Sequence, residues 1–210
     1  MQLAPASFAA LLVAMPVVAL GQAQSSITSL RGIELGSELK TSTRSECPRE
    51  SGQYVFPVGD EFRTRMGDKQ CWTSMNSFAL RLSSPLFAQY QVHNVSEIQG
   101  MLSTVGTSIV DGRIEAMESV FGRGGYEAFR EALVQRYGRF DKEEPVVLQF
   151  RTGASITVRR ATWSRPESTL RIDERVESMD VGAVSLYSRK WLDSQRSAEK
   201  EVVERARGKL

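Results

Sequence analysis

Apolar side chains recur at every second position in most segments after Gln89, a spacing that places them on one face of a β-strand. Turn-forming residues separate these segments at intervals of about ten residues. Short strands that follow one another in this way favour an antiparallel sheet over βαβ units. The predicted strands are 90–95, 98–102, 107–110, 113–121, 146–150, 155–163, 169–176 and 182–188.

The clearest local signal is the Asp111-Gly112 pair between two apolar runs. Both residues tolerate positive φ, so the pair predicts a tight hairpin. Upstream, Phe78–Leu82 alternates like a strand. The segment Leu30–Gly36 is either a short strand or the start of a helix, with Gly32 and Gly36 marking turns.

Two segments have helical character instead. Apolar residues between Gly125 and Gly138 fall at i, i+3, i+7 and i+11, which predicts an amphipathic helix that ends at Gly138. These residues are Tyr126, Phe129, Leu133 and Tyr137. The second segment, 191–210, predicts an exposed helix, because a thin apolar stripe runs through charged residues. That stripe consists of Leu192, Ala198, Val202 and Ala206, and Lys200/Glu204 and Glu201/Arg205 are i,i+4 pairs beside it.

Together these patterns predict an α+β fold, with a mainly antiparallel sheet packed by one amphipathic helix and a C-terminal charged helix. Residues 24–190 form the predicted domain. A division into two sub-halves, 30–105 and 106–190, stays open.

The chain begins with an uncharged stretch, since Arg31 is the first charged side chain. The apolar run Phe8–Leu20 has 13 residues, too few for a membrane-spanning helix of about 20. It fits the centre of a signal peptide, predicted as residues 1–23 with cleavage after Ala23, or after Gly21. The alternative is a buried N-terminal helix. No later stretch is apolar enough to span a membrane, so we expect a periplasmic or secreted protein.

The two cysteines, Cys47 and Cys71, follow this leader and are 24 residues apart. An even number of cysteines in an exported protein favours a disulfide. A redox pair would normally show Cys-x-x-Cys spacing. A zinc site would need four ligands, and the chain has a single histidine.

Composition and charge exclude several classes of function. The 210 residues include 27 Lys+Arg and 25 Asp+Glu, and the net charge of +2 is too small and dispersed for a nucleic-acid surface. His93 is the sole imidazole, and no Gly-x-Ser-x-Gly nucleophile elbow is present. We therefore predict no catalytic, cofactor-binding or metal-binding residues.

Acidic neighbours leave one enzymatic alternative open. They occur at Asp60-Glu61, Glu143-Glu144 and Asp173-Glu174. A glycosidase-like envelope hydrolase would need two carboxylates across a cleft, about 5–9 Å apart. Adjacent residues of a strand point to opposite faces, so the fold would have to bring separate carboxylates together.

Several short motifs occur in order along the chain after the leader. They are Arg31–Gly36, Cys47-Pro48 with Cys71-Trp72, Val110–Ile114, Arg136–Gly138 and Ala161–Trp163. Their order resembles a loose group of small exported bacterial proteins of unknown function. The Gly-x-x-Leu-Gly opening is also similar to periplasmic modules of the outer-membrane assembly lipoprotein type. The resemblance implies no catalytic residues.

These observations favour a non-catalytic binding module in the periplasm or outside the cell. Its expected partner is another envelope or secreted protein. We expect the binding face on the predicted sheet, at Arg159, Trp163 and Arg171.

Overall fold

The computed structural model describes residues 26–40, 44–50, 53–54, 69–74, 90–93, 95, 98–101, 104–150, 153–176 and 181–207. The predicted signal peptide and the predicted strand Phe78–Leu82 lie outside these residues. Among the described helices, none is both long and apolar enough to cross a membrane.

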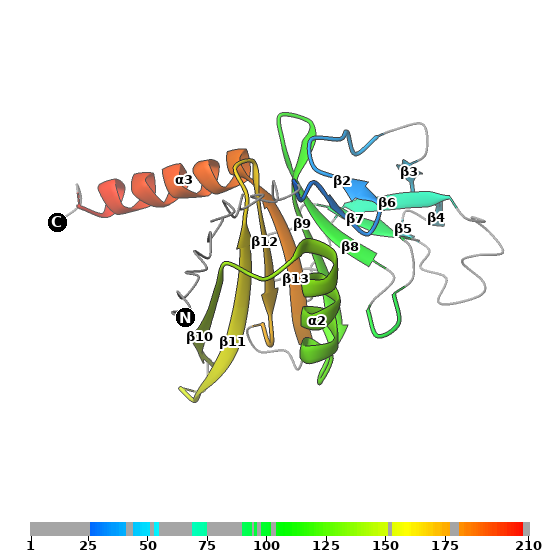
Figure 1. Ribbon diagram of the computed structural model, residues 1–210. Coiled ribbons are helices and arrows are strands. Elements are labelled where there is room, and N and C mark those ends of the chain that lie inside the picture. Colours follow the sequence, from blue (N-terminus) through cyan, green and yellow to red (C-terminus); the bar gives the residue numbers. More distant parts are fainter. Residues whose placement is uncertain are drawn as a thin grey trace, which may run out of the picture.

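A nine-stranded sheet forms the body of the molecule, in the order β10-β11-β12-β13-β9-β8-β7-β6-β3 (Figure 1). Its strands are β3 (Arg44–Glu46), β6 (Gln70–Ser74), β7 (Tyr90–His93), β8 (Thr104–Val110), β9 (Arg113–Gly122), β10 (Lys142–Gln149), β11 (Ser155–Ser164), β12 (Ser168–Asp173) and β13 (Val181–Ser188). Every neighbouring pair is antiparallel except β3–β6, which is parallel. The predicted α+β fold with a mainly antiparallel sheet is confirmed, and the parallel edge pair makes the sheet mixed.

The sheet continues across the proposed boundary between the two sub-halves. Val105 and Gly106, which flank that boundary, are consecutive residues of β8. Val105 pairs with Val92 of β7, and Gly106 pairs with Glu118 of β9. The described strands from both sides of residue 105 therefore belong to one sheet.

Asp111 and Gly112 form the predicted hairpin turn between β8 and β9. Their φ angles are 50° and 77°, as a two-residue turn of this hand requires. Below the turn, Ile109 faces Ile114 but Ser108 faces Ala116, so β9 carries one extra residue. This bulge sends Ile114 into the main core while Ala116 joins a second cluster.

The segment Leu30–Gly36 is a second small hairpin rather than the start of a helix. Its strands are β1 (Ser29–Leu30) and β2 (Ile33–Glu34), joined by Arg31 and Gly32, which both have positive φ. Arg31 is buried and donates a hydrogen bond to Ser119 Oγ at 3.0 Å. The hairpin thereby attaches to the centre of the sheet. A separate pair, β4 (Arg49–Glu50) with β5 (Gln53–Tyr54), forms a second small sheet.

Helix α2 (Tyr126–Tyr137) covers one face of the large sheet (Figure 1). The predicted stripe is confirmed: Tyr126 is buried, and Phe129, Leu133 and Tyr137 are half-buried against the core. The helix ends at Gly138, whose φ of 81° needs a residue without a Cβ. We call this side of the sheet the helix face and the other side the open face.

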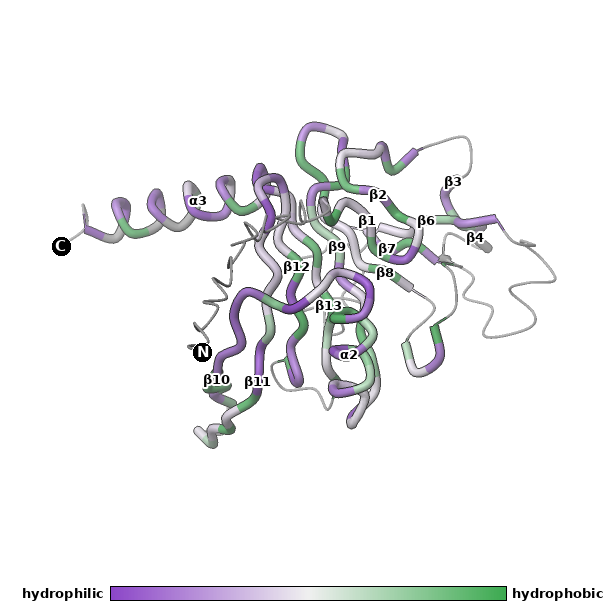
Figure 2. Tube along the Cα trace, viewed as in Figure 1, coloured by the Kyte–Doolittle hydropathy of each residue, from purple (hydrophilic) through white to green (hydrophobic). Residues whose placement is uncertain are grey.

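Helix α3 (Arg189–Arg207) leaves the end of β13 and projects away from the sheet (Figure 1). The C-terminal charged helix is therefore confirmed, and Figure 2 shows mainly hydrophilic positions along it. Within its first turn, however, Trp191 is buried because it packs against Ala116 and Tyr187. The predicted Glu201–Arg205 ion pair is present, with 3.1 Å between Oε2 and Nη2.

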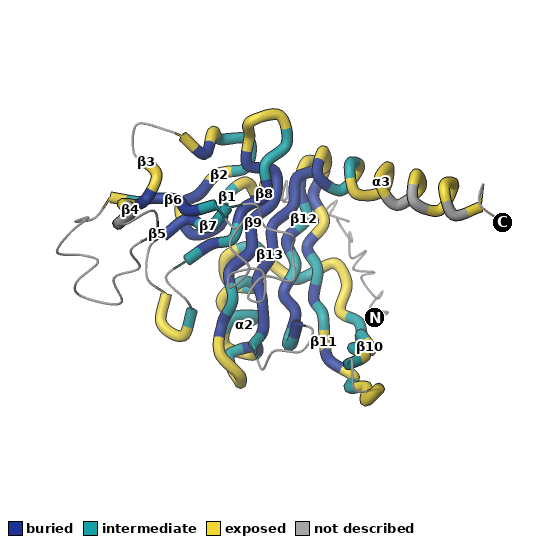
Figure 3. Tube along the Cα trace, turned by 180° about the vertical axis from the view of Figure 1, so that it is seen from behind, coloured by how far each residue is buried: buried dark blue, intermediate teal, exposed yellow. Residues whose placement is uncertain are grey.

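Strand β10 forms one edge of the sheet and contains Pro145. Arg159 of β11 is the residue that pairs with Pro145. Its backbone N–H donates to the Glu174 side chain and its C=O accepts from the Glu174 N–H, so both groups point toward β12 and away from β10. Pro145 therefore occupies a position whose backbone groups point out of the sheet, where no partner N–H is needed. Figure 3 shows the contrast between the buried central strands and the exposed β10 and α3.

Cys47 and Cys71 form the predicted disulfide, with their Cα atoms 4.9 Å apart. Cys71 belongs to β6, and Cys47 directly follows β3, so the bond fixes the parallel strand pair at this edge of the sheet. Both residues are buried.

Candidate functional site

The three residues of the predicted binding face do not share one surface. Arg159 and Trp163 are an even number of residues apart in β11 and lie on the helix face. Arg171 pairs with Thr162 and lies on the open face. Trp163 is fully buried, and its Nε1–H donates to the Gly138 carbonyl at 2.8 Å. Its role is to hold the end of α2 against the sheet.

Arg159 joins α2 to the sheet through ion pairs. Its Nη2 lies 3.0 Å from Glu174 Oε1, and its Nη1 donates to Glu127 of α2. The guanidinium also lies 4.7 Å from the ring centre of Tyr126. The hydrogen bonds that Arg159 donates to Glu174, and then to Glu127, raise the pKa of Arg159 above its usual range. The side chain is half-exposed, but its donors are engaged within the protein.

Arg171 belongs to a buried charged cluster on the open face. Asp173 lies between two guanidiniums, with Oδ1 2.5 Å from Arg160 Nε and Oδ2 2.6 Å from Arg171 Nε. The Arg171 guanidinium lies 5.2 Å from the ring centre of Tyr187. Burial raises the pKa of Tyr187, so this phenol stays protonated at neutral pH.

The carboxylates of the hydrolase alternative are bound by basic side chains. Glu143 pairs with Arg130, Glu144 with Lys142, Asp173 with Arg160 and Arg171, and Glu174 with Arg159. Asp60 and Glu61 lie outside the described residues. Within the described part of the chain, no group of three His, Cys, Asp or Glu side chains is placed to hold a metal ion.

His93 is buried in β7, and its Nε2 lies 2.9 Å from Thr73 Oγ1. Burial lowers the pKa of this imidazole to about 4. The ring is therefore neutral at pH 7 and is held between neighbouring strands.

The lowered pKa of His93 predicts a pH-dependent stability. An unfolded histidine takes up a proton near pH 6.5 and the folded one only near pH 4, so the unfolded state gains protons first on acidification. We expect the free energy of unfolding to fall between these pH values by on the order of 2 kcal/mol. Urea denaturation at pH 7, 5.5 and 4.5 measures it. The matched variant His93→Gln should lose this part of the slope, and an unchanged slope would contradict the assignment.

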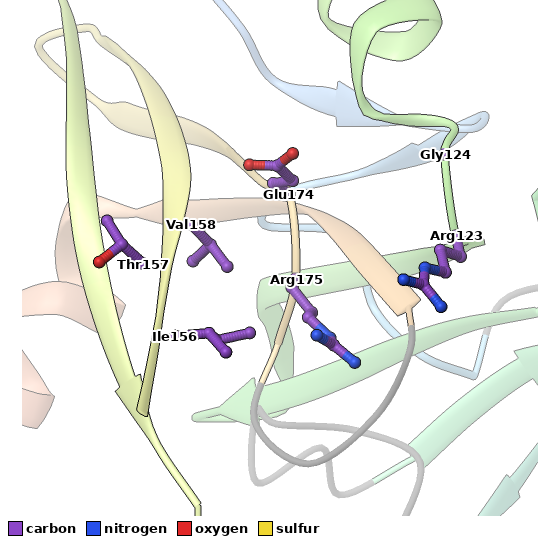
Figure 4. Close-up of a pocket in the computed structure, with 7 residues that line it drawn as sticks. All are labelled: Arg123, Gly124, Ile156, Thr157, Val158, Glu174 and Arg175. Atoms are coloured by element: carbon purple, nitrogen blue, oxygen red, sulfur yellow. The ribbon is translucent and has the colours of Figure 1, made fainter. Parts of the chain in front are cut away.

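One cavity of about 370 Å³ lies at the ends of β11 and β12 (Figure 4). Its lining is Arg123, Gly124, Ile156, Thr157, Val158, Glu174 and Arg175. The view shows Arg123 on one side and the β11 residues on the other, with Glu174 and Arg175 between them. Glu174 is neutralised by Arg159, and the Arg175 guanidinium lies 5.8 Å from the Phe150 ring centre. These side chains already make contacts within the protein.

A second cavity of about 480 Å³ lies where three distant parts of the chain meet, and we call it the Trp72 groove. Its lining is Glu38, Leu39, Lys40, Trp72, Tyr90, Ile109, Asp111, Gly112 and Arg113. Strands β6 and β7 supply the two aromatic residues, and the β8–β9 hairpin supplies one wall. An isolated bridge between Glu38 and Arg113 holds the 38–40 segment beside that hairpin. This volume is within the range of small-ligand pockets, roughly 300–1,000 Å³.

The aromatic residues of the groove are fixed by their contacts. The rings of Trp72 and Tyr90 meet edge to face, with centroids 5.6 Å apart and planes at 89°. Lys40 Nζ lies 5.6 Å from the Trp72 ring centre. The two rings therefore form a fixed surface.

Trp72 also carries the least satisfied polar group of the groove. The residue is only 8% exposed, and its Nε1 atom is buried from solvent without a hydrogen-bond acceptor among the residues that the structure describes. Trp163, by contrast, donates its N–H to Gly138. A buried donor without an acceptor is rare in folded proteins and requires a specific explanation.

The sequence alone does not predict the Trp72 groove. The sequence places Trp72 beside a cysteine and Tyr90 in a strand, but no local pattern brings residues 38–40 to the hairpin at 109–113. The chain matches no model of a known protein family, no curated protein and no solved structure.

Proposed function

We propose that the protein is a non-catalytic binding module that acts in the periplasm or after secretion, with the Trp72 groove as its binding site. Its proposed partner is another envelope or secreted protein. The apolar leader, the disulfide and the resemblance to small exported proteins support the location. The groove replaces the predicted face at Arg159, Trp163 and Arg171 as the proposed contact region.

The observation that carries the proposal is the preformed aromatic pair of Trp72 and Tyr90, which meets edge to face in the lining of a cavity of about 480 Å³. The fixed aromatic rings also lower the entropy lost on binding.

Differential capture tests the proposal. The exported, disulfide-bonded protein is immobilised and exposed to an envelope fraction, and the retained proteins are compared between variants. Tyr90→Ala removes the ring that contacts Trp72, so we expect it to lose the retained partner. Tyr137→Ala is the matched control, because it removes a half-buried tyrosine from α2, away from the groove.

Retention by wild type and Tyr137→Ala, together with loss in Tyr90→Ala, supports the groove as the site. Equal retention by all three proteins contradicts it. Mass spectrometry of the same preparation tests the location, with Gln24 or Gln22 expected as the first residue. A protein that keeps Met1 after export would contradict the leader assignment.

A further inference from the structure

We infer that the first turn of helix α3 positions the Trp72 groove, because it holds the β8–β9 hairpin that forms one wall of the groove. This inference rests on the proposed function, since it names Trp191 as a positioning residue for that binding site. Trp191 lies outside the groove lining that the structure describes. It acts through the other side of the hairpin.

The β8–β9 hairpin has different neighbours on its two sides. Ile109 and Asp111 line the groove. Val110, which lies between them in the chain, packs against the second core cluster, to which Trp191 belongs. Successive side chains of a strand point to opposite faces, so the same short segment contacts both the groove and the cluster. A change in the cluster that moves Val110 therefore moves the groove wall.

The first turn of α3 is itself fixed to the sheet by two backbone donors. The N–H of Arg189 donates to the Glu167 carbonyl at 2.9 Å, and the N–H of Trp191 donates to Ser188 Oγ at 3.0 Å. These hydrogen bonds attach the helix at the end of β13, at the end of the sheet that carries the hairpin (Figure 1). The buried Trp191 ring is thus held by a rigid base.

Lys190 makes a second contact between α3 and the hairpin. Its Nζ lies 2.7 Å from Asp111 Oδ2, but the two side chains are 48% and 78% exposed. Exposed ion pairs of this kind contribute little to stability. The position of the hairpin therefore depends more on the buried Trp191 than on this ion pair.

The hairpin also holds the opposite wall of the groove, residues 38–40. Strand β13 ends its pairing with β9 at Ala116, so the edge of β9 before that residue is open to another segment. There Gly36 N–H donates to the Ile114 carbonyl at 2.8 Å, and Ile114 N–H donates to the Ser37 carbonyl at 2.9 Å. A displaced hairpin would therefore displace both walls.

Hydrogen–deuterium exchange of the protein without any partner tests this positioning role. Trp191→Ala removes the largest side chain of the second cluster, so we expect the amides of 109–116 and 34–38 to exchange roughly tenfold faster. Trp191→Phe keeps an aromatic ring and should restore most of the protection. Glu201→Gln is the matched control, because it breaks the ion pair with Arg205 in the exposed part of the same helix. It should exchange like wild type.

The amides of β11 and β12 separate a local effect from a global one. An unchanged exchange of the hairpin in Trp191→Ala overturns the inference. An increase of the same size in β11 and β12 also overturns it, because the substitution would then act through global unfolding.

Capture from the envelope fraction relates the same variants to binding. We expect Trp191→Ala to retain severalfold less of the protein that wild type captures, while Trp191→Phe and Glu201→Gln retain it. Full retention by Trp191→Ala, with loss in Tyr90→Ala, overturns the inference and leaves the Trp72 groove as the site. Full retention by Tyr90→Ala would instead contradict the proposed function, and the exchange experiment would still decide whether α3 holds the hairpin.

Discussion

Replacing Cys47 and Cys71 together by alanine is expected to lower the free energy of unfolding by about 3–4 kcal/mol. The disulfide closes a loop with a sequence separation of 24 residues, and this is the cost of that closure in the chain-entropy description. The bond also fixes the β3–β6 pair, and Trp72 directly follows Cys71 in β6. The double variant should therefore lose ligand capture at lower denaturant concentrations than wild type.

Urea denaturation with and without a reducing agent measures this effect. Reduced wild type should unfold close to the double variant, and reducing agent should leave the double variant unchanged. A difference below about 1 kcal/mol would show that the native contacts at this edge hold without the bond.

Gly182→Ala is expected to lower the free energy of unfolding by about 3 kcal/mol. A Cβ at this position would lie 2.2 Å from two ring atoms of Phe121 and 2.8 Å from the backbone oxygen of Asp173. The ring of Phe121 is itself held by Phe129, with centroids 4.9 Å apart. The Asp173 oxygen belongs to a neighbouring strand and cannot move without disturbing the sheet.

Gly122→Ala is the matched control, because Gly122 lies beside this site in the same strand pair. A Cβ there meets no atom within 4 Å, and its φ does not require glycine. We expect a change within about 0.5 kcal/mol, in urea or thermal unfolding. Equal effects of the two substitutions would contradict the packing described around Phe121.

The sequence predicted the elements whose signals are local. Asp111-Gly112 encodes its hairpin because the two residues accept positive φ, and the helix before Gly138 is encoded by its spacing of apolar residues. The disulfide followed from the presence of two cysteines in a chain that is predicted to be exported. Each of these features depends on few residues and on little tertiary context.

The predicted binding face depended on tertiary structure, and the fold places its residues on two faces of the sheet. Arg159 and Trp163 share a face by their even spacing, but Arg171 lies on the other face because it pairs with Thr162. That register is set by the turn between β11 and β12. The parallel β3–β6 pair has no sequence signal of comparable strength, and without it the location of Trp72 could not be predicted.

The prediction for helix α3 is correct for most of its length but not for Trp191. The alternation of charges predicted an exposed helix, but the stripe that began at Leu192 omitted Trp191. Trp191 anchors the first turn because β13 delivers it beside Ala116, a residue that reaches this face through the β9 bulge. The contact therefore depends on an irregularity in another strand.

Pro145 limits how the molecule can associate with copies of itself. An exposed edge strand is a template on which further chains can add by backbone hydrogen bonding. At this edge the ring of Pro145 removes one outward donor in the middle of β10, where Val147 would otherwise offer an apolar neighbour. Fibrillar growth from β10 is thereby interrupted at its centre, which favours solubility at high local concentration.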